Sequence, residues 1–145
     1  MAGYSGTPLA KKLGIKPGHA VGLVGAPEGF EATLEGLPAG VIVLRRLARA
    51  GRFDVMVCFF TRRANFEKAF AGLRGQLDPA GGLWIAWPKR SSGVPTDLTE
   101  NILREVVLPS GMVDNKVCAV DERWSGLRFV WRLKNRPGGA GSSRP

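Results

Sequence analysis

The chain has 145 residues, the size of one domain, and 44% of them are hydrophobic, which excludes wholesale disorder. No apolar run approaches the ~20 residues that cross a bilayer. The first residues show no cationic segment followed by an apolar one, so we expect a soluble cytoplasmic protein with no membrane partner. The net charge of +9 leaves nucleic acid open as a partner, because basic proteins gain affinity for phosphate backbones by releasing counterions.

The positive charge is spread along the chain in short pairs and continues into the C-terminal end. Residues 134–145 contain cations, no acids and no apolar pattern. We therefore predict one α/β domain over residues 1–133 and a disordered basic tail over residues 134–145. The scattered pairs are typical of a solvated surface, and sequence-independent nucleic-acid binding stays open as an alternative.

The first half of the chain predicts two helices and three strands. The first helix has Thr7 as its N-cap, proline at its first position and Gly14 as its stop. The first strand is a continuous apolar run, typical of a strand buried on both faces. In chain order the elements cover residues 7–14 (helix), 19–25 (strand), 28–36 (helix), 41–44 (strand) and 53–60 (strand).

The second half predicts two more helices and three more strands. Thr96 or Asp97 caps the second of these helices, and Glu100 follows Asp97 in capping-box register. Cys58 and Cys118 lie in apolar strands, so we predict buried free thiols and no metal site. The elements cover residues 63–77 (helix), 83–87 (strand), a helix ended by Pro109 and Gly111, and strands over 112–120 and 127–133.

Strands that alternate with helices predict an α/β fold. We expect a mostly parallel, Rossmann-like sheet with helices on both faces. The short connection between the last two strands predicts a C-terminal antiparallel hairpin.

Ligands of such sheets bind at the carboxyl ends of the strands, which directs attention to the loops that leave them. These loops are rich in arginine and serine, and guanidinium groups bind phosphate or carboxylate through paired hydrogen bonds. One loop also precedes a helix N-terminus, which attracts anions. An ordinary long connection with a capped helix explains the same loop equally well. The candidate ligand-binding residues are Glu28, Arg45, Arg62, Lys89, Arg90, Ser91, Ser92 and Thr96.

Two resemblances follow from these segments. Residues 53–60, the helix after them, and residues 77–85 (LDPAGGLWI) with the final hairpin resemble the second half of class I methyltransferases. That resemblance covers residues 53–133 and implies a methyltransferase-like sheet. Those enzymes hold S-adenosylmethionine with a glycine-rich loop after the first strand and an acid at the end of the second. Here the second strand ends in an arginine pair, which cannot accept hydrogen bonds from ribose, so we predict no cofactor.

A second resemblance covers nearly the whole chain up to residue 133. Four segments resemble a family of small bacterial proteins described as a domain of unknown function. They are residues 4–18 (YSGTPLAKKLGIKPG), 87–93 (WPKRSSG), 96–101 (TDLTEN) and 117–129 (VCAVDERWSGLRF). The resemblance implies no activity and no catalytic residue.

The sequence therefore predicts binding at the carboxyl edge of the sheet, by a small anionic ligand or a protein partner. Whether the chain is an enzyme stays open: it has one histidine, and no phosphate-binding loop or serine-nucleophile motif. A divergent S-adenosylmethionine-dependent methyltransferase is the alternative enzyme, and a nucleic-acid binder is the other alternative. The ligand and the oligomeric state are not predicted.

Overall fold

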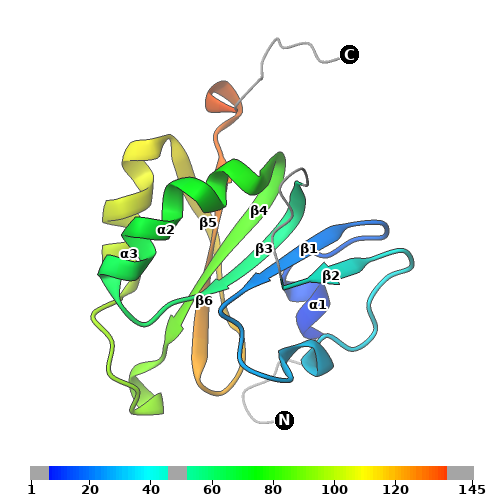
Figure 1. Ribbon diagram of the computed structural model, residues 1–145, viewed down its shortest axis with the longest axis horizontal. Helices are drawn as coiled ribbons and strands as arrows, with labels where there is room; N and C mark the ends of the chain where they lie inside the picture. The colour runs from blue at the N-terminus through cyan, green and yellow to red at the C-terminus, as the bar shows by residue number, and fades with distance from the viewer. Residues whose placement is uncertain (1–6, 46–51, 137–145) are drawn as a thin grey trace.

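Six strands form one sheet in the order β2-β1-β3-β4-β6-β5 in the computed structural model, which describes residues 7–45 and 52–136 (Figure 1). The strands β2, β1, β3 and β4 pair in parallel, whereas β6 runs antiparallel to β4 and β5. The predicted mostly parallel sheet with a C-terminal antiparallel hairpin is therefore confirmed. The strands are β1 (Ala20–Val24), β2 (Ile42–Leu44), β3 (Phe53–Phe59), β4 (Leu77–Pro88), β5 (Met112–Ala119) and β6 (Trp124–Trp131).

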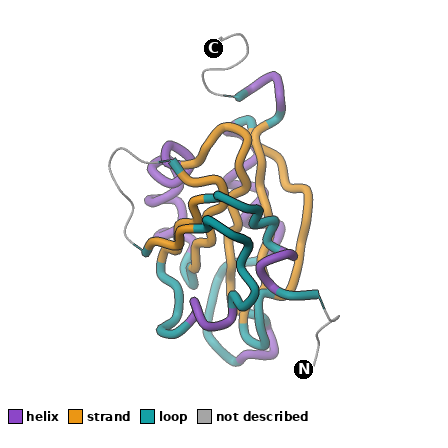
Figure 2. Tube along the Cα trace, turned by 90° about the vertical axis from the view of Figure 1, so that its right-hand side faces the viewer, coloured by secondary structure: helices purple, strands orange, loops and turns teal. Residues whose placement is uncertain are grey.

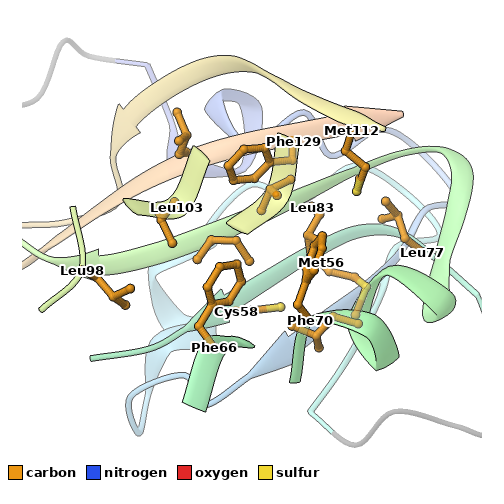
Figure 3. Close-up of a cluster of buried hydrophobic side chains, with 14 of the residues drawn as sticks. Met56, Cys58, Phe66, Phe70, Leu77, Leu83, Leu98, Leu103, Met112 and Phe129 are labelled. Atoms are coloured by element: carbon orange, nitrogen blue, oxygen red, sulfur yellow. The ribbon is translucent and has the colours of Figure 1, made fainter. Parts of the chain in front are cut away.

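Two longer helices cover one face of the sheet. Side chains alternate along β3, so Met56 and Cys58 point to the face under α2 and α3, and both are fully buried. Phe66 and Phe70 of α2 and Leu103 of α3 pack onto that face (Figure 3). This packing explains the regular apolar spacing that predicted α2. The helices are α1 (Leu9–Lys12), α2 (Arg63–Gln76) and α3 (Glu100–Val107), with 3₁₀-helices η1 (Phe30–Thr33), η2 (Arg90–Ser92), η3 (Leu108–Ser110) and η4 (Leu133–Asn135).

The other face is covered by α1 and η1. Trp84 of β4 is fully buried there, and its indole Nε1–H donates to the carbonyl of Leu13 at 3.0 Å. This bond ties the end of α1 to the middle of the sheet. Phe59 meets Phe30 and Trp124 edge-on, with ring centroids 5.2 and 5.0 Å apart. Trp124, the first residue of β6, thus packs against the sheet.

The predicted helix over residues 28–36 is wrong, because only the 3₁₀-turn η1 forms there. Gly29 and Gly36 both have left-handed backbones, with φ of 80° and 74°, and these bound the turn on each side. Phe30 and Leu34 are nevertheless buried, so the spacing of the apolar residues predicted correctly which side chains are buried. Thr7 is also not the cap of α1: Pro8 holds that position and makes no side-chain hydrogen bond.

Strand β4 begins at Leu77, directly after α2, and not at residue 83 as predicted. Leu77 pairs with Phe53, and the ladder then shifts register before Val55 pairs with Gly82. Residues 78–82, which contain Pro79, Gly81 and Gly82, therefore follow α2 as the irregular first part of β4. Both cysteines are free; Cys58 is buried, but Cys118 on the edge strand β5 is only half-buried, against the prediction.

The sheet has two ends that matter below. We call the end where β1, β3 and β4 finish the carboxyl edge, and the opposite end, where they begin and β6 finishes, the amino edge. Loops gather at the carboxyl edge, at the bottom of Figures 1 and 2, and η4 lies at the top. No helix within the described ranges is long and apolar enough to span a membrane. Of the predicted tail, Lys134 and Asn135 belong to η4, whereas residues 137–145 lie outside the described residues.

Candidate functional site

The carboxyl edge holds the predicted ligand-binding residues in two separate groups. Glu28 and Arg45 follow β1 and β2, and Lys89 to Thr96 follow β4. Strand β3 lies between β1 and β4, and neighbouring strands are about 4.8 Å apart, so the two groups are at least about 10 Å apart across the sheet. Arg62, which follows β3, lies between them in strand order. Arg46 of the predicted arginine pair lies outside the described residues.

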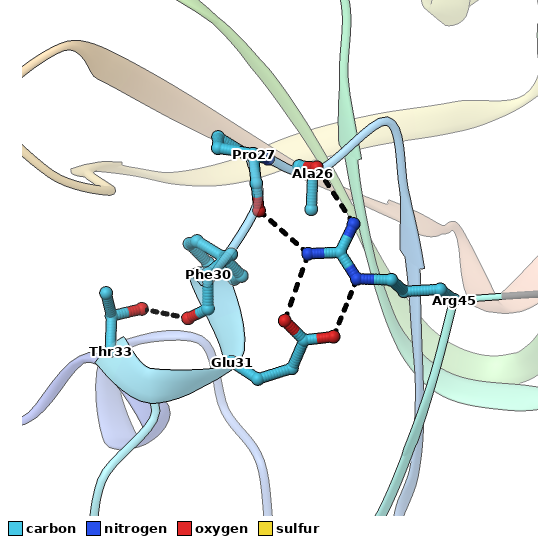
Figure 4. A network of polar contacts seen from close by, with 6 residues as sticks. All are labelled: Ala26, Pro27, Phe30, Glu31, Thr33 and Arg45. Atoms are coloured by element: carbon cyan, nitrogen blue, oxygen red, sulfur yellow. Dashed lines mark hydrogen bonds and ion pairs between the residues drawn. The ribbon is translucent and has the colours of Figure 1, made fainter.

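Arg45 is held by acceptors of the protein itself (Figure 4). Its Nε and Nη2 donate to the two carboxylate oxygens of Glu31 at 2.6 and 3.0 Å. Nη1 donates to the carbonyl of Ala26 at 2.9 Å, and Nη2 donates to that of Pro27 at 2.7 Å. The guanidinium therefore joins the end of β2 to the loop that follows β1, and closes this part of the edge. Glu28 is exposed beside it.

The Arg45–Glu31 pair predicts a pH dependence that can be measured. Hydrogen bonds from Arg45 lower the pKa of the Glu31 carboxyl from 4.5 to about 2. A lowered pKa means that the pair stabilises the folded state above pH 4.5, and that this stabilisation is lost as the pH falls towards 2. We expect a carboxyl NMR titration to place Glu31 near pH 2 in the wild type, and close to its ordinary value in Arg45→Gln. Titration of wild-type Glu31 near pH 4.5 would contradict the bonded geometry.

The loop that follows β4 is fixed at three points. The backbone N–H of Lys89 donates to the carbonyl of Arg123 in the hairpin at 2.8 Å. The Thr96 hydroxyl donates to the carbonyl of Thr61 at 2.6 Å. The Asp97 carboxylate accepts the backbone N–H of Arg63, the first residue of α2, at 2.7 Å. These bonds hold the loop against the end of β3 and the start of β6.

Neither Thr96 nor Asp97 caps α3, so that prediction is wrong. The cap is Thr99, whose hydroxyl accepts the N–H of Ile102 at 3.1 Å. Asp97 instead stabilises the start of α2, a role that sequence reasoning missed. The start of α2 could have indicated this role. Arg62 at its N-cap position has no side-chain acceptor and the first turn contains no acid, so the free N–H groups there need an acceptor from elsewhere in the chain.

A cavity of about 610 Å³ lies between η2, the loop and the start of α3. Arg90 and Asn101 contribute polar groups to it, and Trp87, Pro88 and Leu98 give it an apolar side. Glu100 also borders the cavity; its carboxylate accepts a hydrogen bond from Arg104 at 2.9 Å, and Arg104 also pairs with Asp114 at 3.1 Å. The cavity therefore combines one unpaired cation, one paired carboxylate and an apolar wall.

The predicted serines and cations of the loop divide by what they contact. The Ser92 hydroxyl donates to the carbonyl of Lys89 and accepts the N–H of Val94, so it stabilises η2. Ser91 is exposed. Arg62, Lys89 and Arg90 form no ion pair with any other residue that the structure describes. Their charge is available to a bound anion.

A larger hollow of about 970 Å³ lies beside α1 and η1, away from these cations. Its charged lining residues are Lys12, Glu35 and Asp121, which together are negative. Asp121 accepts the backbone N–H groups of Arg123 and Trp124, so it serves the hairpin turn. This hollow does not suit an anion, and we place the candidate site in the smaller cavity.

We assign no catalytic residue. The thiol of Cys58 lies in the core, where burial raises its pKa, and the ring of His19 accepts the backbone N–H of Lys16 through Nδ1 at 3.1 Å. Within residues 7–45 and 52–136, no three His, Cys, Asp or Glu side chains are placed to hold a metal ion.

Several solved structures similar to this chain are methyltransferases. The ribosomal protein L11 methylase of Lactobacillus delbrueckii subsp. bulgaricus aligns with a TM-score of 0.60 and 15% identity over 86% of this chain and 75% of that chain. The magnesium protoporphyrin IX methyltransferase of Synechocystis PCC 6803, solved with bound SAM, aligns with a TM-score of 0.57 and 13% identity over 86% and 74%. A SAM-dependent methyltransferase of Aquifex aeolicus aligns with a TM-score of 0.53 and 16% identity over 83% of this chain and 86% of that chain. The chain therefore has a methyltransferase-like Rossmann fold.

No protein-family model and no curated protein matches the chain. The resemblance to a family of small bacterial proteins stays a prediction.

Proposed function

We propose that this chain is a binding domain on a methyltransferase-like fold, which takes up a small anion with an apolar part in the cavity between η2 and α3. The observation that supports this most is the pairing of an unneutralised cation, Arg90, with the apolar wall of Trp87 and Leu98. Phosphate and carboxylate groups both suit a guanidinium, so a free ligand and the carboxylate of a protein partner would meet the same groups.

The carboxyl ends of β1 and β2 do not fit S-adenosylmethionine. The methyltransferase resemblance requires an acid at the end of β2 to accept hydrogen bonds from ribose, but Arg45 stands there and has only donors. The guanidinium also occupies the carbonyls of Ala26 and Pro27. The loop after β1 thus contacts Arg45 and its partner Glu31. The ribose hydroxyls of the cofactor would need an acceptor that is not already bonded to an arginine.

A divergent methyltransferase is the second candidate, and the fold of the three structural neighbours is what favours it. Likeness at 13–16% identity indicates the fold alone. The two candidates differ in one simple observation. A binding domain with a closed β1–β2 end gains no thermal stability from millimolar S-adenosylmethionine, whereas a methyltransferase does.

Phenyl phosphate is a suitable probe, because it joins a phosphate to an aromatic ring. We expect it to raise the melting temperature of the wild type, and the double substitution Lys89→Ala and Arg90→Ala to weaken binding at least tenfold. Charge-assisted hydrogen bonds typically contribute about 1.5–3 kcal/mol each, which is a factor of ten or more. Calorimetric titration measures the change directly.

The matched control removes two exposed cations elsewhere, Lys11→Ala and Lys68→Ala. This variant has the same net charge as the test variant and should bind phenyl phosphate like the wild type. Both variants should fold, because exposed charges contribute little to stability. Equal binding by the test variant and the wild type, or no stabilisation by any anion at millimolar concentration, would show that the loop is only a connection.

A further inference from the structure

The amino edge of the sheet, opposite the candidate site, collects cations that the proposed function does not use. It joins the start of β3, the end of α2 and the end of β6, which lie together at the top of Figure 1. Phe53 pairs with Leu77, which places the start of β3 beside the end of α2. Strand β6 is the antiparallel neighbour of β4, so its end lies at the same edge of the sheet. The cations there are Arg52, Arg74, Arg132, Lys134 and Arg136, which we call the amino-edge cations.

The amino-edge cations are not neutralised by the protein. None of the five forms an ion pair with another described residue. The acids nearest in sequence are Asp54 and Asp78, which accept the backbone N–H groups of Ala20 and Ala80 at 2.8 and 2.9 Å and keep their charges. Five cations therefore face two acids at this edge. Arg52, Arg132 and Lys134 are exposed. The excess positive charge at this edge is therefore available to a partner.

A sixth arginine extends the charge onto the sheet. Arg128 of β6 is half-buried, and its guanidinium packs directly against Gly82, where a side chain would clash with Nε. Its hydrogen-bond partner is the Asn115 side chain, at 3.3 Å, and not an acid. Burial lowers the pKa of this arginine, as expected for a cation that has no carboxylate beside it. An anion at the edge would supply the missing countercharge.

We infer that the amino edge binds the phosphate backbone of a nucleic acid, without reading its sequence. Two of these cations stand next to strand ends: Arg52 precedes β3 and Arg132 follows β6. Because β4 lies between these strands, the two arginines are at least about 10 Å apart across the sheet. A duplex carries about one phosphate charge per 1.7 Å of its axis, so several phosphates lie within that distance. Four of the five amino-edge cations are arginine, the side chain that binds phosphate through two parallel bonds.

A lipid surface suits this edge less well than a nucleic acid does. Proteins that lie on membranes present an amphipathic helix with a continuous apolar face. Here the exposed elements are strand ends and the three-residue helix η4, whose large exposed apolar side chain is Leu133. A row of cations without an apolar face matches a linear polyanion.

The test compares two triple variants of equal charge. The edge variant carries Arg52→Gln, Arg132→Gln and Lys134→Gln. The control variant carries Lys11→Gln, Lys68→Gln and Arg123→Gln, all exposed and away from the edge. Binding to a fluorescent 20-base-pair DNA duplex, and to the RNA duplex of the same sequence, is measured by anisotropy over a range of salt concentrations.

We expect the wild type to bind both duplexes, and the edge variant to bind at least tenfold more weakly at 100 mM salt. The slope of log affinity against log salt should fall by about three, one for each phosphate contact removed. The control variant should keep most of the affinity and the slope. The Lys89→Ala, Arg90→Ala variant should also keep them, which separates this inference from the proposed function.

Three results would overturn the inference. One is the absence of duplex binding by the wild type at low salt. Another is equal weakening of the edge and control variants, which would mean that net charge matters and position does not. The third is binding to phosphatidylserine vesicles, or to polyglutamate, as tight as binding to the duplexes. Melting curves of both variants confirm that each is folded.

Discussion

Replacing Trp84 with alanine should lower the free energy of unfolding by about 3–5 kcal/mol, as other large-to-small substitutions of buried aromatic residues do. Trp84 is fully buried between the sheet and α1. The substitution leaves a cavity and also removes the hydrogen bond from Nε1 to the carbonyl of Leu13. Because α1 has only four residues and its N-cap makes no side-chain hydrogen bond, this bond holds it in place. Denaturant unfolding monitored by circular dichroism measures the loss.

Two further variants separate the parts of that effect. Trp84→Phe keeps an aromatic ring but leaves the Leu13 carbonyl without its donor, so we expect an intermediate loss. Leu133→Ala changes a side chain that is 73% exposed, and should change the stability by less than about 0.5 kcal/mol. A loss below 1 kcal/mol in Trp84→Ala would contradict the packing of α1 on β4.

Two glycines should respond to the same substitution with opposite signs. A Cβ on Gly81 would lie 2.5 Å from the backbone carbonyl oxygen of Asp54, so β3 and β4 must separate to admit it. We expect Gly81→Ala to destabilise the protein by about 1–3 kcal/mol, the usual range for overpacking. Gly72 lies within α2, and a Cβ there meets nothing within 4 Å. Gly72→Ala should therefore stabilise the protein by about 0.5–1 kcal/mol.

Thermal unfolding of the two variants side by side tests this pair. The contrast depends on the irregular start of β4, where the backbone of β3 closely approaches Gly81. If Gly81→Ala melted at or above the wild-type temperature, the close approach of β3 to Gly81 would be wrong.

The sheet could be predicted because its strands are buried on both faces and therefore appear as continuous apolar runs. The run over residues 53–60 indicates a strand buried on both sheet faces, and the spacing of Phe66, Phe70 and Leu73 indicates burial of one helix face. Residues 28–36 misled because their apolar spacing reported burial of Phe30 and Leu34, while Gly29 and Gly36 decided the backbone. Spacing predicts which side chains are buried better than it predicts the helix type.

The candidate site was predictable only as a set of loops. The local sequence pattern predicted Asp97 as a cap of α3. In the structure it instead accepts the N–H of Arg63, the first residue of α2, which is 34 positions earlier in the chain. Arg45 was predicted as a ligand-binding cation, yet its partner Glu31 comes from a turn that the sequence predicted as a longer helix. Tertiary contacts determine which polar groups are already hydrogen-bonded within the protein, and therefore which polar groups remain free to bind a ligand.

Amide chemical-shift mapping of the isotopically labelled protein tests the central claim most directly, because it reports both ends of the carboxyl edge in one experiment. Phenyl phosphate should shift the signals of Arg90, Thr96 and Asn101 around the cavity, and S-adenosylmethionine should leave those of Ala26 and Arg45 unchanged. The claim would be contradicted if S-adenosylmethionine moved the signals of Ala26 and Arg45, or if phenyl phosphate moved none around the cavity.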